Sequence, residues 1–586
     1  MTSATVVHRL IERAGRTPRA PAFLWREPAG TWHSEDWGGV LARVRNTSLR
    51  LRALGVNPGD RVVLMMPTSP RWEYAHLAAL AAGAVVAGVD AHDSDENLRH
   101  ILAAVSPQAV FAGDAQQLDR LRALLPRPVA ITVLGCGAAR GAHELEALSQ
   151  PGANAASEDA SAWALCHAEM PATIVFTSGS TGKPKGIEYT HGQLGIAVDA
   201  ILACFPDVGA QSRLACWLPL SNLFQRIIDL CAISCGAQTW FVDPPTEIAA
   251  RLPEIRPALF VGVPRFFEKL HAGILEELAR RPLPVRWLAG LAWEIGVRFR
   301  RARRAGQLPG ALQRWIHAAA ERLVLRRLRE AVTGDALRFM VSGSAPFPPW
   351  LLDRLHGIGW LVLEAYGISE NVVPVALNVP GAYRFGSVGR PVPGSELRFA
   401  PDGELLVRGP GVFRGYLGSE AAEGALDGDG FLHTGDFARL DPDGYLWLTG
   451  RKSEVFKTST GRRVAPAAVE AALKRLPYVE HAMVTGAGRP VPVAILSVAP
   501  RALAGRGDAA LAEDIAKVCA DLPEAARIAG AVLTERPFTI AAGELTANLK
   551  LRRKPIEAEH AGALDALYQA LAARGAHGGC LVQRAG

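Results

Sequence analysis

Short apolar segments alternate with helical stretches through the first 150 residues, and this alternation restricts the fold more than any other feature of the chain. The helical stretches are HRLIERAG and LARVRNTSLRLRALG, and the apolar segments are RVVLMMP, AVVAGVD and QAVFAGD. The pattern returns in QTWFVD, PALFVGVP, LRFMVSGSAP and GWLVLEAYG. Such alternation favours a largely parallel β-sheet covered by helices. We therefore predict an α/β fold in which ligands gather beyond the carboxyl ends of the strands.

The sequence changes in character at Gly386, after which short strands and tight turns predominate. The DPDG sequence between FARL and YLWL is typical of a β-hairpin turn. After Gly450 a smaller unit follows, with the helix PAAVEAALKRL, the strand PVPVAILSVA, the helix LAEDIAKVCADL and a terminal helix near 561–573. Because 586 residues exceed the length at which one core usually stops growing, we expect two domains, 1–450 and 451–586, with the boundary at Arg451 to Ser453.

Cysteine usage and the N-terminal sequence indicate a reducing compartment. The eight cysteines are irregularly spaced and none forms a CxxC pair, so a disulfide framework is not expected. The stretch MTSATVVHRLIERAGR has an acid and arginines where a signal peptide needs an apolar segment. The sequence also lacks a run of about 18 apolar residues. We therefore expect a cytoplasmic protein.

Positive charge is concentrated in one segment. The formal net charge is +7, and residues 281–329 contain twelve arginines, no lysine and two acids, Glu294 and Glu321. Apolar residues recur there at spacings of three and four, with a break at Gln307 to Gly310, which predicts two amphipathic helices. This pattern fits peripheral contact of residues 281–330 with the anionic inner face of a membrane, or an ordinary solvated face on packed helices. Nucleic acid is a weaker candidate, because no zinc spacing or RNP-like motif accompanies the charge.

The stretch TSGSTGKPKG, Thr177 to Gly186, combines hydroxyls, glycines and two lysines. Backbone N–H groups and small hydroxyls can wrap a polyphosphate, and glycine permits its close approach. The loop is not a Walker A motif, because only two residues separate Gly179 from Gly182 and Pro184 follows Lys183. The flanks ATIVF and IEYT predict strands, so the loop joins strand to strand. By itself the stretch fits either a nucleotide-binding loop or an ordinary surface hairpin.

Four stretches have to be considered together: TSGSTGKPKG, EAYGISE (364–370), HTGDFARLDPDGYLWLTGRK (433–452) and ELTANLKLRRK (544–554). In their order and spacing they resemble the AMP-forming acyl-CoA synthetases of the adenylate-forming superfamily, from roughly Asp60 to Tyr568. The stretches VPRFFEKLHAGI and PGAYRFGSVGRP are most similar to the long-chain fatty acyl branch. The resemblance implies a large N-terminal adenylate-forming domain of stacked sheets and helices with a small β-barrel-like part, and a small, mobile α+β C-terminal domain.

The resemblance also implies a reaction. In this family a carboxylate attacks the α-phosphate of ATP, giving acyl-AMP and pyrophosphate, and a thiol then displaces AMP. The implied enzyme is an acid–thiol ligase that uses ATP, Mg²⁺ and coenzyme A and acts on a medium- or long-chain fatty acid or another apolar carboxylic acid. The phosphopantetheine thiol of a carrier protein is an alternative acceptor. A non-catalytic adenylate-binding regulatory protein is an alternative of another class.

Nucleotide-binding residues follow from the matched motifs. The resemblance assigns the β- and γ-phosphates to the hydroxyls and N–H groups of the loop, with Lys185 adding charge. It places Tyr366 against adenine, and the two acceptor oxygens of Asp436 on the ribose hydroxyls, within reach of Arg451. The expected nucleotide-binding set is Thr177, Ser178, Gly179, Ser180, Thr181, Gly182, Lys185, Gly343, Ser344, Ala345, Glu364, Ala365, Tyr366, Gly367, Ser369, Asp436 and Arg451.

The resemblance assigns catalytic roles to Lys550, Glu370 and Arg451. Glu370 and Thr177 are the expected ligands of Mg²⁺, which usually takes only one or two carboxylates. Lys550 matches the C-terminal lysine that neutralises charge between the carboxylate and the α-phosphate, and Lys554 in the same basic run is the alternative. The small domain is then expected to close so as to deliver Lys550, and to rotate about the boundary to admit the thiol.

Three positions depart from the family pattern. Where long-chain synthetases usually carry a histidine and a glutamate–arginine pair, this chain has Asn222 and Gln225, followed by Arg226. Both changes remove a titratable group and keep hydrogen-bonding capacity on the acyl side of the site. At the domain boundary, Ser453 stands where lysine or aspartate is common.

A polar cluster at Asp90, His92 and Asp93 invites interpretation as a metal site. Aspartate and histidine are metal ligands, but they also begin helices. We favour a polar loop that caps the next helix.

Overall fold

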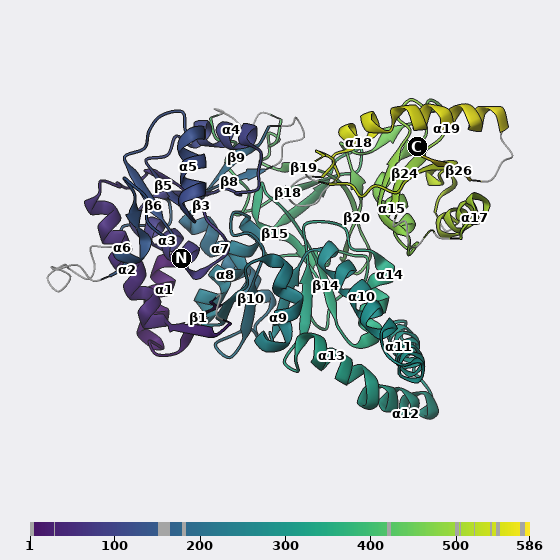
Figure 1. Ribbon diagram of the computed structural model, residues 1–586, viewed down its shortest axis with the longest axis horizontal. Helices are drawn as coiled ribbons and strands as arrows, with labels where there is room; N and C mark the ends of the chain where they lie inside the picture. The colour runs from purple at the N-terminus through teal and green to yellow at the C-terminus, as the bar shows by residue number, and fades with distance from the viewer. Residues whose placement is uncertain are drawn as a thin grey trace. The chain divides into compact units, whose positions relative to one another are not determined.

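The structure is a computed structural model, drawn as a ribbon in Figure 1. It describes residues 5–27, 30–150, 164–177, 183–418, 424–498, 503, 505–520, 522–539, 542–545, 551–574 and 580–585. The chain divides into two compact units: a larger one of 1–347, 351–397 and 406–433, and a smaller one of 348–350, 398–405 and 434–586.

The first sheet of the larger unit is largely parallel. Its strands, in order across the sheet, are β7 (His143–Glu144), β6 (Ile131–Leu134), β5 (Ala109–Ala112), β3 (Arg61–Met65), β4 (Val85–Gly88), β8 (Pro171–Thr177) and β9 (Lys185–Thr190). Val63 and Met65 belong to one buried cluster and Val62 and Leu64 to another, so alternate residues of β3 bury opposite faces. Only β9, at the edge, runs antiparallel to its neighbour among the described pairings.

The second sheet has a parallel centre and antiparallel edges. Its strands, in order, are β16 (Arg390–Pro391), β15 (Asn371–Leu377), β14 (Val362–Ile368), β13 (Phe339–Ser342), β12 (Leu259–Gly262), β10 (Arg213–Cys216), β11 (Gln238–Phe241), β1 (Pro21–Arg26) and β2 (Trp32–Asp36). The strands from β14 to β1 are parallel, whereas β15, β16 and β2 are antiparallel to their neighbours. The predicted α/β class is therefore confirmed.

Helices fill the space between and around these sheets (Figure 1). One core joins strands of both sheets to α1 (Val6–Arg16), α2 (Trp37–Ala53), α3 (Pro70–Ala81), α7 (His191–Cys204) and α8 (Leu223–Cys235). The opposite face of the first sheet is covered by α4 (Asp95–Val105) and α5 (Ala115–Leu124). A capping box of Thr190 and Gln193 ends β9 and begins α7, which fixes the strand that follows the phosphate-loop candidate.

The arginine-rich segment is helical, as predicted. Its elements are α11 (Leu283–Arg304), α12 (Ala311–Ala320), a π-helical turn (Glu321–Leu325) and α13 (Arg326–Thr333), and α10 (Pro264–Ala279) precedes it. The expected break at 307–310 separates α11 from α12. Helix α11 packs closely on α14 (Pro349–Ile358), since a Cβ added to Gly296 would lie 2.1 Å from the carbonyl oxygen of Gly357. In the larger unit of Figure 1, α11 and α12 lie at the periphery, away from the sheets.

The remaining short elements of the larger unit connect these layers. They are α6 (Leu145–Ser149), a 3-10 turn (Pro245–Glu247) and α9 (Ile248–Ile255).

A further sheet has the order β17 (Glu396–Phe399), β18 (Glu404–Arg408), β19 (Leu432–Leu440) and β20 (Leu446–Arg451). Strands β19 and β20 pair antiparallel around the DPDG turn, which confirms the predicted hairpin.

The C-terminal part of the smaller unit is an α+β sandwich. Its sheet runs β23 (Val479–Thr485), β24 (Val493–Val498), β25 (Gly530–Thr534) and β26 (Leu581–Arg584). Ala494 and Leu496 pack against α15 (Pro466–Leu473) and α17 (Asp508–Cys519), whereas Val493 and Ile495 pack against α18 (Arg553–Glu559) and α19 (Ala561–Arg574). Val493–Val498, within the predicted strand PVPVAILSVA, is therefore a strand buried on both faces. The short strands β21 (Phe456–Lys457) and β22 (Arg463–Val464) precede it, and a 3-10 turn (Glu524–Ala526) precedes β25.

Candidate functional site

The TSGSTGKPKG stretch connects two antiparallel strands. Thr177, the last residue of β8, pairs with Lys185, the first residue of β9, so the stretch joins strand to strand as predicted. One arm of the hairpin is fixed by His100 of α4, whose Nε2 lies 2.9 Å from the carbonyl oxygen of Pro184. The residues between, Ser178, Gly179, Ser180, Thr181 and Gly182, lie outside the described residues.

A strained turn follows β13. Ser344 has φ +71°, a left-handed conformation that is unfavourable for a residue with a Cβ. Strain of this kind is retained where surrounding structure requires it, often at functional sites. The neighbouring Gly343 is buried, and a Cβ there would lie 3.8 Å from the carbonyl oxygen of Ala365. The turn that contains the predicted residues Gly343, Ser344 and Ala345 therefore adjoins, at Gly343, the strand that carries the EAYGISE motif.

The EAYGISE motif occupies β14 and the turn into β15. Tyr366 is 7% exposed and Glu364 is buried, whereas Gly367 and Ser369 are exposed. Burial raises the pKa of Glu364 to about 8, although N–H groups of Gly386 and Phe347 donate to the carboxyl and oppose the shift. The Gly386 nitrogen lies 2.8 Å from Glu364 Oε2. Glu364 is thus a buried carboxyl group that connects the turn at Gly386 to the motif strand.

Two tyrosines hold the turn that carries Glu370. The Tyr189 hydroxyl of β9 donates to the carbonyl oxygen of Ser369 at 2.5 Å. The Tyr416 hydroxyl donates to Glu370 Oε1 at 3.0 Å. Lys185 Nζ lies 4.7 Å from the centroid of the Tyr416 ring. The larger unit therefore brings together two predicted stretches that are nearly 180 residues apart in sequence.

Sequence reasoning missed both tyrosines. Tyr189 stands in the strand pattern IEYT, where an aromatic residue is ordinary core material. Tyr416 lies in FRGYLG, a short stretch with no periodicity. The available signal was the position of Tyr189 four residues after Lys185, which places it on the strand that leaves the loop.

Asp436 and Arg451 meet in the smaller unit. They face each other in the register of β19 and β20, and Arg451 Nε donates to Asp436 Oδ1 at 2.8 Å. Asp436 is 4% exposed, whereas about half of the Arg451 side chain is exposed. Beside them Lys452 pairs with Asp402 and Glu404, both at 2.8 Å. Lys550 lies outside the described residues, and the alternative Lys554 is exposed on α18.

The residues that depart from the family pattern have structural partners. Asn222 caps α8, with its side-chain oxygen accepting from the Phe224 N–H at 3.0 Å. Gln225 is buried, accepts from the Leu218 N–H at 3.4 Å and donates to Asp229 Oδ1 at 3.1 Å.

Arg226, beside Gln225, is fully buried. It donates to the Thr173 hydroxyl at 2.7 Å, while its Nε and Nη2 have no hydrogen-bond partner among the described residues. Burial lowers the pKa of Arg226 to about 10, against the opposing charge of Glu73. A buried guanidinium with two N–H donors that no described residue accepts is suited to hydrogen-bond an anionic or carbonyl group from outside the described residues.

The Asp90 cluster is a helix-capping loop, as predicted. Asp90 accepts from the His92 N–H and Asp93 from the Ser94 N–H, each at 2.8 Å, and Ser94 caps α4. Among the residues that the structure describes, no group of three or more His, Cys, Asp or Glu side chains could hold a metal ion. The Mg²⁺ role expected of Thr177 and Glu370 would accordingly draw on protein ligands few in number, as this cation commonly does.

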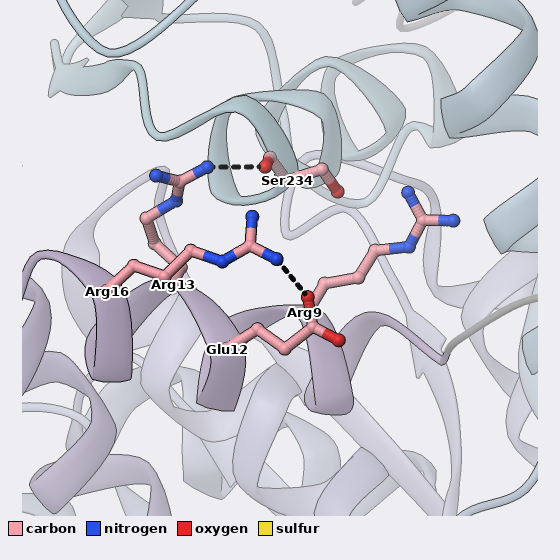
Figure 2. Close-up of a pocket in the computed structure, with 5 residues that line it drawn as sticks. All are labelled: Arg9, Glu12, Arg13, Arg16 and Ser234. Carbon is pink, nitrogen blue, oxygen red and sulfur yellow. Dashed lines mark hydrogen bonds and ion pairs between the residues drawn. The ribbon is translucent and has the colours of Figure 1, made fainter.

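A small cavity between α1 and α8 is lined by Arg9, Glu12, Arg13, Arg16 and Ser234 (Figure 2). Arg13 donates to the Ser234 carbonyl oxygen at 2.9 Å, and Arg16 donates to Glu12 at 3.3 Å. Arg9 makes two hydrogen bonds of 2.7 Å to Asp199. These guanidinium groups serve contacts within the protein, and the cavity of about 150 Å³ contains none of the motif residues.

Comparisons with known proteins identify the family. The family described as AMP-binding enzyme matches residues 10–417, and the AMP-binding enzyme C-terminal domain matches residues 454–572. The long-chain-fatty-acid–CoA ligases FadD15 of Mycobacterium bovis and Mycobacterium tuberculosis are 33% identical over 561 residues, which cover 92% of this chain and 93% of each relative. The long-chain-fatty-acid–CoA ligase heimdall of Drosophila melanogaster is 28% identical over 640 residues, which cover 94% of this chain and 92% of the relative.

Solved structures share the fold. The adenylation domain of a carboxylate reductase from Mycobacterium chelonae has a TM-score of 0.77 at 20% identity and covers 97% of this chain and 91% of that one. The anthranilate CoA ligase AuaEII, in complex with anthranoyl-AMP, has a TM-score of 0.74 at 20% identity, and the match covers 97% of this chain and 99% of that one. No helix in the described part of the chain is both long and apolar enough to cross a membrane. The chain belongs to the family of AMP-binding, adenylate-forming enzymes, as the resemblance of its motifs predicted.

Proposed function

We propose that the protein is an ATP- and Mg²⁺-dependent ligase that activates a medium- or long-chain fatty acid, or a similar apolar acid, and transfers the acyl group to coenzyme A. One observation carries the proposal: the phosphate-loop hairpin and the turn bearing Glu370 meet through Tyr189 and Tyr416. The relatives named long-chain-fatty-acid–CoA ligase support the substrate class and the thiol.

The reaction has two displacements. A carboxylate oxygen of the acid attacks the α-phosphorus of ATP, and the bond to pyrophosphate breaks. The thiolate sulfur then attacks the acyl carbon, and AMP leaves. Thr177 and Lys185 hold the β- and γ-phosphates in line for the first step, where positioning and charge neutralisation dominate. The half-buried Glu370 carboxylate and the Thr177 hydroxyl are hard oxygen donors that fit Mg²⁺, which would neutralise phosphate charge when bound.

The smaller unit supplies the remaining groups in this proposal. Asp436, oriented by Arg451, accepts from the ribose hydroxyls, and Lys550 neutralises charge at the α-phosphate. Movement about a boundary at Arg451 to Ser453 delivers Lys550 for adenylation and withdraws it for thiol transfer. The small Ser453 side chain is compatible with backbone rotation there.

Two alternatives remain within the same sequence. A carrier-protein phosphopantetheine thiol could replace coenzyme A as the acceptor. The alternative of a non-catalytic adenylate-binding protein was suggested by Asn222 and Gln225. In the structure, however, Asn222 caps α8 and Gln225 donates a hydrogen bond to Asp229. Their presence therefore does not favour loss of turnover.

The test uses the full-length protein with ATP, Mg²⁺ and a series of acids, from palmitate to shorter and aromatic acids. Acid-dependent release of AMP and pyrophosphate is expected, with an optimum among apolar acids. Offering coenzyme A or a phosphopantetheinylated carrier protein to preformed acyl-adenylate then identifies the acceptor. Absence of AMP release with every acid contradicts the proposal.

We also propose that residues 281–330 make peripheral contact with an anionic membrane surface. Large apolar side chains on α11, on α12 and in the connection between them face solvent: Trp287 is 69% exposed, Trp315 70% and Leu308 96%. They are accompanied by Leu283, Val285, Leu288, Leu291, Leu312, Ile316 and Leu323, all more than a third exposed. Groups of exposed, large apolar side chains mark interaction surfaces, and tryptophan favours the membrane interface.

The charges of this surface fit an anionic partner. Arg286, Arg298 and Arg314 are exposed and form no ion pair among the described residues. Other arginines of α11, such as Arg301 and Arg304, pair with Asp353 and anchor the helix. Arginine at an anionic bilayer contributes about 1 kcal/mol each, in addition to burial of the apolar side chains.

A further inference from the structure

The segment that contains Tyr416 joins the two halves of the nucleotide site. Its backbone pairs with β9, because the Leu417 N–H donates to the Gly186 carbonyl oxygen at 2.8 Å and Tyr416 forms an antiparallel bridge with Ile187. At its other end the Phe413 N–H donates to the carbonyl oxygen of Glu370 at 2.9 Å. The segment is thus fixed to both motif stretches by main-chain hydrogen bonds.

The Tyr416 ring is itself held in place. The buried Phe413 ring contacts it edge to face, with centroids 4.9 Å apart at an interplanar angle of 70°. Such edge-to-face pairs contribute beyond their buried area. A half-buried tyrosine held in this manner loses little conformational freedom when it makes further contacts.

Two side chains of opposite charge contact Tyr416. The Glu370 carboxylate accepts from the Tyr416 hydroxyl, and the Lys185 ammonium lies over the ring face. In the described part of the chain, Lys185 and Glu370 form no ion pair with each other.

We infer that Tyr416 is a positioning residue that keeps the Lys185 cation and the Glu370 carboxylate apart and orients the carboxylate for Mg²⁺. This inference rests on the proposed function. The hydroxyl occupies Oε1 and leaves Oε2 to the metal, an outer-shell contact of the kind that raises metal affinity. The ring attracts Lys185 without neutralising it, so that the ammonium remains available for phosphate.

Two substitutions separate these contributions. Tyr416→Phe removes the hydrogen bond to Glu370 and keeps the ring, whereas Tyr416→Leu removes both. Loss of an outer-shell contact to a metal ligand typically costs between 10- and 100-fold in affinity. Tyr416→Phe should therefore raise the Mg²⁺ concentration needed for half-maximal ATP binding by roughly tenfold, with ATP binding at saturating Mg²⁺ kept. Tyr416→Leu should weaken ATP binding even at saturating Mg²⁺.

Tyr74→Phe is the matched control, because the Tyr74 hydroxyl also donates to a carboxylate, Glu35, at 2.5 Å in the same unit. Calorimetric titration of the full-length protein with ATP at a series of Mg²⁺ concentrations measures binding without turnover. Identical Mg²⁺ dependence in wild type, Tyr416→Phe and Tyr74→Phe overturns the inference and leaves the proposed function standing. An equal shift in Tyr74→Phe also overturns it. Wild-type protein that binds MgATP but releases no AMP with any acid overturns the proposed function alone, and wild-type protein that binds no MgATP overturns both.

Discussion

Arg451 reaches across two antiparallel strands of the smaller unit to donate from Nε to Oδ1 of the buried Asp436, 2.8 Å away. A carboxylate fixed in this manner is suited to the paired hydroxyls of a ribose, the role that we propose for it.

Asp436→Asn should raise the KM for ATP, because an amide offers one acceptor oxygen and loses the ion pair with Arg451. Hydrogen bonds to a charged group are worth about 1.5–3 kcal/mol, which corresponds to roughly 10- to 100-fold in KM. Acid-dependent pyrophosphate exchange measures this value. Asp443→Asn, in the exposed turn of the same hairpin, is the control. An unchanged KM in Asp436→Asn would refute the ribose assignment.

Lys550→Ala should separate the two half-reactions. Removal of a cation that stabilises transition-state charge should slow acyl-AMP formation by at least about 100-fold. Transfer of the acyl group from supplied acyl-adenylate to coenzyme A should change little, because the role that we propose for Lys550 is in adenylation. Lys554→Ala, four residues on and exposed, is the control for the same basic run. The reverse result, with Lys554 essential and Lys550 dispensable, would assign the role to the alternative lysine.

The architecture was predictable from the sequence where local pattern and tertiary burial agree. Strand β24 was recognised because it is apolar except for Ser497 and is buried on both faces. The hairpin at DPDG was recognised because the turn residues specify it. Tyr416 had no such signal, since its function depends on a bridge to Ile187, more than 200 residues earlier in the chain. Contacts between distant segments carry no local periodicity.

The site was predictable in part for the same reason. The resemblance proposed roles for the motif residues Thr177 and Glu370, but it did not predict the hydrogen bonds that Gln225 makes. A buried glutamine in an apolar helix looks like a lost catalytic group until its partners, Asp229 and the Leu218 N–H, are seen. Likewise, the exposed apolar face of α11 and α12 has the spacing of an ordinary core-facing helix.

Glu364→Gln should change how stability depends on pH. The folded pKa of Glu364, about 8, is above its ordinary value of 4.5, so the folded protein binds this proton more tightly than the unfolded chain. Stability from this group is therefore complete below about pH 4.5 and is lost as pH rises toward 8. Wild type should lose melting temperature relative to Glu364→Gln over that interval in calorimetric scans. Glu396→Gln, on an exposed edge strand, should run parallel to wild type.

Changing Trp287 and Trp315 together to serine should abolish binding to anionic vesicles. Two interfacial indoles are lost, and the remaining arginine attraction is screened as salt rises. Sedimentation with phosphatidylglycerol-containing vesicles at low salt should retain wild type, and neutral phosphatidylcholine vesicles should not. Leu440→Ser, which changes an exposed apolar residue outside the arginine-rich segment, is the control. Equal sedimentation of the double variant and wild type would exclude this surface as the docking site.

Gln225→Glu should destabilise the larger unit even though it restores the residue usual in long-chain synthetases. The Gln225 amide donates to Asp229, whose pKa burial and the charge of Glu73 raise well above its ordinary value. A glutamate there removes the donor and sets a second carboxyl beside a buried one, at a cost of roughly 1–3 kcal/mol. Adding Asp229→Asn should recover most of the lost melting temperature, because the new amide can donate to the glutamate. If Gln225→Glu alone melts as high as wild type and turns over faster, the glutamine is a lost catalytic group rather than a partner of Asp229.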